Sequence, residues 1–259
     1  MIPPANTYVK NKSVLHKLGL CKLPYRMSCD YRGDGFGTKG KSLQFMEDPK
    51  FKQAWDYTAA RHLATTGLKA PDVRWRAHTA IWAAQNGLRL EGDFVECGVF
   101  TGLLSMMICR YFGFENTDRN FWLFDTWSGV PVDGVSEAER KVADGNNKSY
   151  YHRDGVFEAV TESFAPFPHV RMIQGMLPET LAQADIQKIA YLSIDLNNAD
   201  YEKACIDILW PKLSTGAVIL LDDYGFAAYR PQQEMWDNFA AAQGRSIATL
   251  PTGQGILIK

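Results

Sequence analysis

The 259-residue sequence lacks the features that mark several classes of protein. Its 28 basic residues balance its 29 acidic ones, so it has no excess of positive charge with which to bind a nucleic-acid backbone. Its longest apolar runs, such as Ala217 to Leu221, are far shorter than the roughly 20 residues that cross a bilayer. We therefore expect neither a dedicated nucleic-acid-binding protein nor a membrane protein.

The sequence also has no Cys-x-x-Cys pair among its five cysteines, and its first residues lack the apolar core of a secretory signal. These absences predict reduced, mostly buried thiols in a cytoplasmic protein. A hydrophobic share of 46% excludes a disordered chain, because it is enough to build a core.

The first 69 residues are predicted to form an N-terminal arm and helix that serve as a lid or as oligomer contacts. A polar stretch with closely spaced glycines from Gly33 to Gly40 predicts a flexible arm. Asp48-Pro49 then predicts a helix start, and Gly67 predicts its end. The apolar face of this helix is expected to carry Phe51, Trp55, Ala59 and Leu63.

A second helix is predicted from Pro71 to Asn86-Gly87, and short apolar runs that end in polar residues follow it. These runs are 93–96, 121–125, 189–195 and 217–221, with a weaker one at 169–174. Near-continuous hydrophobicity is typical of parallel strands that are buried on both faces. We therefore predict that residues 70–259 form one α/β domain with a doubly wound, mostly parallel, Rossmann-like sheet and a C-terminal antiparallel hairpin. The polar segment 132–155 is predicted to be a surface lid.

Acidic residues stand at successive strand ends: Glu96, Asp125, Asp195, Asp222 and Asp223. The carboxyl ends of parallel strands share one edge of the sheet, which is where ligands bind in such folds. Crowded carboxylates repel one another unless a cation or hydroxyl groups meet them. This pattern predicts a ligand site at that edge.

The turn after the first strand reads Glu96-Cys97-Gly98-Val99-Phe100-Thr101-Gly102. Its spacing is G-x-x-x-G, so it lacks the third glycine of the cradle that holds a pyrophosphate. Asp125, at the end of the second strand, can accept hydrogen bonds from both hydroxyls of a ribose. The G-x-x-x-G turn and Asp125 together predict a cofactor that contains a nucleoside and does not need to contain a phosphate.

Asp195, Asp222 and Asp223 offer three oxygen ligands of the kind that Mg²⁺ or a similar ion prefers. The alternative is that one of these carboxylates caps a helix and another is solvated.

Several blocks resemble the macrocin O-methyltransferase family over about residues 70 to 240. They are 90–99 (LEGDFVECGV), 122–131 (WLFDTWSGVP), 173–175 (IQG), 179–181 (ETL) and 221–225 (LDDYG). The resemblance implies the class I methyltransferase fold, with seven strands, and transfer of a methyl group from S-adenosylmethionine to a hydroxyl of a small molecule, most often on a sugar of a natural product. It also implies a divalent ion such as Mg²⁺, bound by Asp195, Asp222 and Asp223.

The resemblance further implies a set of residues that bind S-adenosylmethionine: Glu96, Gly98, Val99, Thr101, Gly102, Asp125, Thr126, Gly175, Met176 and Asp195. In this scheme the first loop holds the methionine end, Asp125 the ribose, and Gly175 with Met176 the adenine. The sequence departs from the family at Asp195-Leu196-Asn197, where Asp-x-Asp is usual, and at Leu103-Leu104, where small residues are usual.

Methyl transfer to a hydroxyl needs a base, and Asp195 is the first candidate. His152, in the predicted lid, is the second, although a surface histidine is the simpler interpretation. Two other functions stay open: an NAD(P)-dependent oxidoreductase and a non-catalytic module that binds S-adenosylmethionine. The family also predicts a homodimer or higher homo-oligomer.

Overall fold

The computed structural model describes residues 29–132 and 137–259 of the chain. It divides into two compact units, Met1–Leu43 and Gln44–Lys259. In the first unit, β1 (Tyr31–Gly33) pairs with β2 (Phe36–Thr38) in an antiparallel hairpin. The turn is Asp34-Gly35, with φ of 52° and 75°. Residues 31–38 of the predicted arm therefore have regular structure, because Asp-Gly favours the left-handed turn of a tight hairpin. Residues 1–28 of the predicted arm lie outside the described residues.

The second unit contains the predicted sheet. Its strands are β3 (Asp93–Cys97), β4 (Phe121–Asp125), β5 (Val170–Gln174), β6 (Ile189–Ile194), β7 (Leu213–Leu221), β8 (Ala248–Thr249) and β9 (Gly255–Ile258). Their order is β5-β4-β3-β6-β7-β9-β8. Strands β3 to β7 run parallel to one another, and β9 pairs antiparallel with both of its neighbours, β7 and β8. The doubly wound, seven-stranded sheet with its C-terminal hairpin is therefore confirmed.

The helices of this unit are α2 (Gln44–Glu47), α3 (Pro49–Thr66), α4 (Arg74–Gly87), α5 (Leu103–Phe112), α6 (Glu137–Asn146), α7 (Val156–Phe164), α8 (Ala199–Leu209) and α9 (Arg230–Ala242). Short turns of helix add η1 (Phe114–Asn116), η2 (Asn147–Tyr151), η3 (Glu179–Gln183), η4 (Trp210–Lys212) and η5 (Ala227–Tyr229). The predicted lid is thus largely helical where it is described, because α6 and η2 fall within it.

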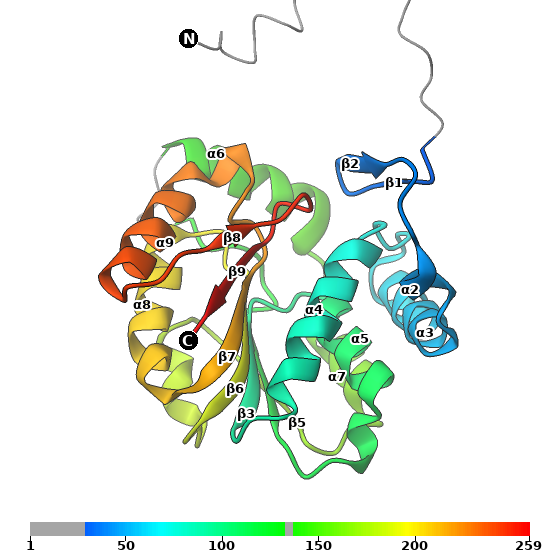
Figure 1. Ribbon diagram of the computed structural model, residues 1–259, viewed down its shortest axis with the longest axis horizontal. Helices are drawn as coiled ribbons and strands as arrows, with labels where there is room; N and C mark the ends of the chain where they lie inside the picture. Colours follow the sequence, from blue (N-terminus) through cyan, green and yellow to red (C-terminus); the bar gives the residue numbers. More distant parts are fainter. Residues whose placement is uncertain (1–28, 133–136) are drawn as a thin grey trace, which may run out of the picture. The chain divides into compact units, whose positions relative to one another are not determined.

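Helices cover both faces of the sheet (Figure 1): α4, α5 and α7 lie on one side, and α8 and α9 on the other. The side chains of β3 alternate between the two cores. Phe94 packs with Phe121 and Tyr191 on one face, whereas Val95 and Cys97 belong to the cluster on the opposite face. Since both faces are covered, the strands read as continuous apolar runs.

Helix α3 begins and ends where the sequence predicts. The Asp48 side chain accepts the Lys50 N–H at 2.9 Å, and Gly67 closes the helix in a left-handed conformation. Its buried face differs from the predicted one, however: it consists of Phe51, Ala54, Thr58, His62 and Thr66, whereas Leu63 is 51% exposed. Two polar members of this face are held by hydrogen bonds: the Thr66 hydroxyl donates to the His62 carbonyl at 2.8 Å, and the bonds of His62 are described below.

Because α3 packs against α5 and α7, it belongs to the same compact unit as the sheet. The Tyr57 hydroxyl, for example, donates to the Ser163 carbonyl at 3.1 Å. The units therefore divide after Leu43, earlier than the boundary at 69/70 that the sequence predicts. The lid and oligomer roles of residues 1–69 stay predictions. Along the described parts of the chain, no helix is long and apolar enough to cross a membrane.

Candidate active site

A pocket of about 690 Å³ opens at the carboxyl ends of β3, β4, β5 and β6. Strand order reverses between β3 and β6, which is the place where open α/β sheets bind ligands. Seven of the predicted cofactor residues line this pocket: Gly98, Val99, Asp125, Thr126, Gly175, Met176 and Asp195. The lining does not include Glu96, Thr101, Gly102, His152, Asp222 or Asp223.

Gly98 lines the pocket at a point where the backbone passes against the end of β6. A Cβ at this position would lie 1.9 Å from the carbonyl oxygen of Asp195, and φ is +86°. Only glycine fits both the space and the backbone conformation. The glycine predicted to let the backbone approach a ligand thus also brings the ends of β3 and β6 together.

The Asp125 carboxylate organises the loops around the pocket. One oxygen accepts the backbone N–H groups of Val99 at 2.6 Å and Phe100 at 2.8 Å. The other accepts the Trp127 N–H at 2.7 Å, and the Trp127 indole N–H donates to the Phe100 carbonyl at 2.8 Å. Asp125 therefore fixes the loops after β3 and β4 in addition to facing the pocket.

Three non-glycine residues with left-handed backbone surround the pocket, one after each of three strands. They are Phe100 (φ 49°), Trp127 (φ 47°) and Asn197 (φ 56°). Such conformations cost of order 1–3 kcal/mol each and cluster at functional sites, where the surrounding structure enforces them. The wall of this pocket is therefore built in a strained, specific form.

Glu96 lies beneath the pocket, 4% exposed. Burial raises its pKa to about 8, and the negative charges of Asp222 and Asp125 add to this effect. Its Oε2 atom has no hydrogen-bond partner among the described residues. A buried carboxyl in this environment is stable when protonated.

His62 of α3, which the sequence analysis did not single out, contacts the loop after β3 and the helical turn η2. Its Nδ1 lies 2.8 Å from the Thr101 hydroxyl, and its Nε2 lies 3.4 Å from the Tyr150 hydroxyl. Burial, with the charge of Arg153, lowers the His62 pKa and keeps the ring neutral. Thr101, which is predicted to bind the cofactor, joins the first loop to α3 through this contact. No local pattern marks His62, because its partners Thr101 and Tyr150 are distant from it in the sequence.

The predicted lid segment forms one wall of the pocket through Tyr151. The Tyr151 ring packs edge-on against Phe100, with centroids 4.9 Å apart, and burial raises the pKa of its hydroxyl. His152, the neighbouring candidate base, is exposed and packs near Gly129 outside the pocket lining.

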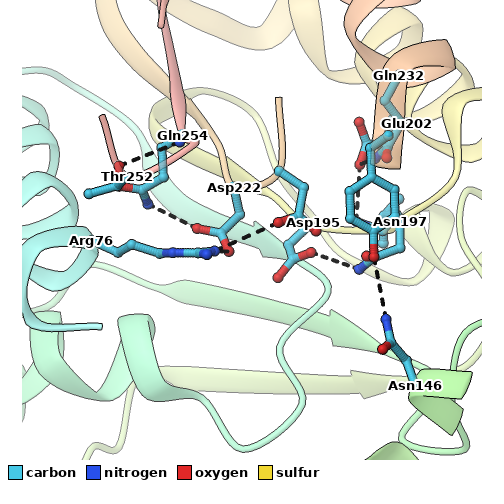
Figure 2. Close-up of polar contacts among 12 residues, drawn as sticks. Arg76, Asn146, Asp195, Asn197, Glu202, Asp222, Gln232, Thr252 and Gln254 are labelled. Carbon is cyan, nitrogen blue, oxygen red and sulfur yellow. Dashed lines mark hydrogen bonds and ion pairs between the residues drawn. The ribbon is translucent and has the colours of Figure 1, made fainter. Parts of the chain in front are cut away.

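Two of the three acids predicted to bind a metal, Asp222 and Asp223, pair with an arginine, and Figure 2 shows the pair with Asp222. The Arg76 guanidinium of α4 lies 2.5 Å from Asp222 Oδ2 and 3.7 Å from Asp223 Oδ1. The other Asp222 oxygen accepts the Gln254 side-chain N–H at 2.9 Å. Asp195 lies beside this group and accepts the Asn197 amide at 2.9 Å, while burial and the charges of Asp223 and Asp222 raise its pKa.

Glu202 of α8 supports the loop that carries Asp195. It accepts the Leu196 N–H at 3.1 Å and the side-chain N–H groups of Gln232 and Trp236 at 2.6 Å each. These bonds hold the loop after β6 from below, so Asp195 is presented on a fixed backbone.

The sheet order and the acid-rimmed pocket at the strand ends define a class I methyltransferase fold. The family model for macrocin O-methyltransferase (TylF) matches residues 76–248, and the chain belongs to this family of O-methyltransferases. The resemblance seen in the sequence is therefore confirmed.

Curated relatives agree with this assignment. The chain is 29% identical over 201 residues to demethyldecarbamoylnovobiocin O-methyltransferase of Streptomyces niveus, covering 69% of this chain and 74% of the relative. It is 24% identical over 203 residues to mycinamicin III 3''-O-methyltransferase of Micromonospora griseorubida, covering 72% of this chain and 74% of the relative.

Solved structures share the fold. The O-methyltransferase NovP superposes with a TM-score of 0.65 at 21% identity, covering 81% of this chain and 97% of that one. A calicheamicin methyltransferase gives a TM-score of 0.60 at 16% identity, covering 85% and 94%.

Proposed function

We propose that the protein transfers a methyl group from S-adenosylmethionine to a hydroxyl of a sugar or a sugar-bearing natural product. The cofactor assignment depends on where the backbone N–H groups of the loop after β3 point. The N–H groups of Val99 and Phe100 both donate to Asp125.

This arrangement argues against a dinucleotide cofactor. In dinucleotide-binding folds, free backbone N–H groups after the first strand receive the pyrophosphate. Here Asp125 already accepts two of them, and the acidic rim repels phosphate. A sulfonium cofactor without phosphate suits the same rim, since carboxylates attract its positive charge.

The walls of the pocket fit the nucleoside half of such a cofactor. Gly175 has φ +143°, and a Cβ there would lie 2.7 Å from the Thr180 side chain, so the backbone borders the pocket without a side chain of its own. Met176 beside it is apolar and 38% exposed, as a surface for an adenine ring would be. When bound, S-adenosylmethionine supplies an electrophilic methyl group.

The acceptor is inferred from the relatives. The name of a Streptomyces olivaceus relative, 29% identical over 152 residues, describes O-methylation of a dimethoxy-rhamnosyl tetracenomycin. It covers 54% of this chain and 56% of the relative. We infer that the acceptor of this chain is a hydroxyl of the same chemical class as the one that this relative methylates.

Asp195 is the base that we propose. It faces the pocket, and its neighbouring negative charges favour uptake of a proton. The acceptor oxygen gives its proton to the Asp195 carboxylate and forms the new bond to the methyl carbon, while the bond from that carbon to sulfur breaks. Orientation of the two reactants in the pocket lowers the barrier further. His152 stays an alternative base on sequence grounds, although it lies outside the pocket lining.

The metal implied by the family does not fit the described arrangement of these acids. Both oxygens of Asp222 accept protein donors, and one donor is the cationic Arg76. Within the residues that the structure describes, no cluster of three His, Cys, Asp or Glu side chains is placed to hold an ion. The Mg²⁺ site and the homo-oligomer stay predictions of the resemblance, and the cytoplasmic location stays a prediction from the cysteines and the first residues of the sequence.

Isothermal titration calorimetry with S-adenosylhomocysteine tests the proposed cofactor. We expect micromolar binding by the wild type and at least tenfold weaker binding by Met176→Asp. Ile208→Asp is the matched control, because Ile208 is a similarly exposed apolar residue on α8 outside the pocket lining. Binding of NADH in preference to S-adenosylhomocysteine would overturn the proposal. Binding of S-adenosylhomocysteine without methylation of any glycosylated acceptor would favour a non-catalytic module.

A further inference from the structure

Arg76 brings a buried positive charge to the edge of the sheet where the family resemblance implies a divalent ion. Its side chain is 12% exposed, and it comes from the first turn of α4. Its guanidinium contacts Asp222 at 2.5 Å and Asp223 at 3.7 Å, and its Cζ lies 5.0 Å from the centroid of the Phe226 ring. A guanidinium with two carboxylates and an aromatic ring around it is held in one position.

The partner of Arg76 is itself fixed from its other side (Figure 2). Gln254, which is fully buried, donates to Asp222 Oδ1 at 2.9 Å and accepts the Thr252 hydroxyl at 3.2 Å. Asp222 is therefore oriented by a chain of protein donors that runs from the turn before β9. Its two oxygens point at Arg76 and at Gln254, and a metal ligand would have to turn one of them away.

Electrostatics oppose a divalent ion at the same place. An ion that contacted Asp222 and Asp223 would lie close to the Arg76 guanidinium, and like charges at that range repel strongly in a partly buried site. In the described contacts Arg76 already pairs with these carboxylates, so an ion would have to displace the guanidinium or lie against its positive charge.

We propose that Arg76 takes the place of the divalent cation: its guanidinium neutralises Asp222, holds Asp223, and makes methyl transfer by this chain independent of a metal. This inference rests on the proposed function for its catalytic part. Arg76 is a positioning residue, because it acts on Asp222 and Asp223 at the edge of the pocket and does not line the pocket itself. The departure from Asp-x-Asp at Asp195-Leu196-Asn197 agrees with this inference, since a neutral amide stands beside Asp195 where the family has a second carboxylate.

The first test measures metal binding to the protein alone, by titration with Mn²⁺ followed by electron paramagnetic resonance. We expect no binding by the wild type at micromolar Mn²⁺. Arg76→Met removes the competing charge, so it should bind Mn²⁺ at least tenfold more tightly than the wild type. Arg76→Lys retains the charge and should behave like the wild type. The matched control is Arg74→Met on the same helix, because Arg74 pairs with Asp72 and not with the acids of the site.

The second test uses methyl transfer. Activity of the wild type should survive exhaustive treatment with EDTA, whereas Arg76→Met should lose at least tenfold in rate and recover when Mg²⁺ is added. A purely structural role for Arg76 would predict loss of activity without recovery by Mg²⁺. Micromolar Mn²⁺ binding by the wild type, or loss of its activity in EDTA, would overturn the proposal.

The two proposals fail in different ways. If S-adenosylhomocysteine does not bind to the wild type, the proposed cofactor is wrong, but the Mn²⁺ titration still decides what Arg76 does. If Arg76→Met does not fold, the wild type itself remains decisive, because micromolar Mn²⁺ binding or loss of its activity in EDTA would still overturn the proposal.

Discussion

The side-chain amide of Asn147 hydrogen-bonds both polar groups of the Val130 backbone. The Val130 N–H donates to Asn147 Oδ1 at 2.7 Å, and Asn147 Nδ2 donates to the Val130 carbonyl at 2.9 Å. Asn147 is 6% exposed, and Val130 lines the pocket. One buried side chain thus ties the helical lid segment to the loop after β4.

Asn147→Ala should loosen this wall of the pocket. It leaves two backbone groups without their partner, which costs about 1–3 kcal/mol where such groups are buried. We expect lower stability in urea and faster hydrogen exchange around Val130 and η2. The neighbouring Asn146→Ala is the control, because among the described residues the Asn146 side chain makes a single long contact, at 3.4 Å to the Tyr229 hydroxyl. Equal effects of the two substitutions would contradict the role given to Asn147.

Glu96 should make the stability of the protein fall as pH rises. Its pKa is about 8 in the folded state and 4.5 ordinarily, so the folded state binds the proton more tightly. The stabilisation from protonated Glu96 is complete below its ordinary pKa and is lost as pH rises through about 8. At 1.36 kcal/mol per pKa unit, the full effect is on the order of 3 to 5 kcal/mol.

Glu96→Gln isolates this effect, because the amide does not titrate. Relative to the wild type, the variant should gain stability when the pH is raised from about 5 to about 9 in urea unfolding experiments. Glu202→Gln is the comparison, since the pKa of Glu202 is about 7 and its effect should appear at lower pH. A difference between wild type and Glu96→Gln that does not change with pH would show that Glu96 is ionised in the folded protein.

Asp195→Asn should separate binding from catalysis. An amide keeps the shape of the side chain but cannot accept the hydroxyl proton, and positioned bases contribute about 10² to 10⁴-fold in rate. We expect a loss of kcat in this range in assays with a rhamnosylated acceptor, together with nearly unchanged affinity for S-adenosylhomocysteine. Asp200→Asn on exposed α8 surface should leave both quantities unchanged. Unchanged turnover by Asp195→Asn would remove Asp195 as the base.

The sequence alone determined the sheet. Runs such as Phe121 to Asp125 are recognisable because a strand buried on both faces must be apolar along its length, and the acid at its end follows from the polar edge of the sheet. The same local reasoning located α3, because Asp48 caps its first turn and Gly67 ends its last turn. Seven of the ten predicted cofactor residues line the pocket for this reason, as they directly follow the strands.

The tertiary structure alone decided which side chains meet around those strand ends. Arg76 and Asp222 are 146 residues apart, and His62 and Thr101 are 39 apart. Nothing near Arg76 in the sequence distinguishes it from Arg74, which pairs with Asp72 two residues away. Secondary structure depends on neighbours within a few residues, so its patterns can be read along the chain. The pairing of buried charges depends on which elements pack together, and that is fixed only when the whole core forms.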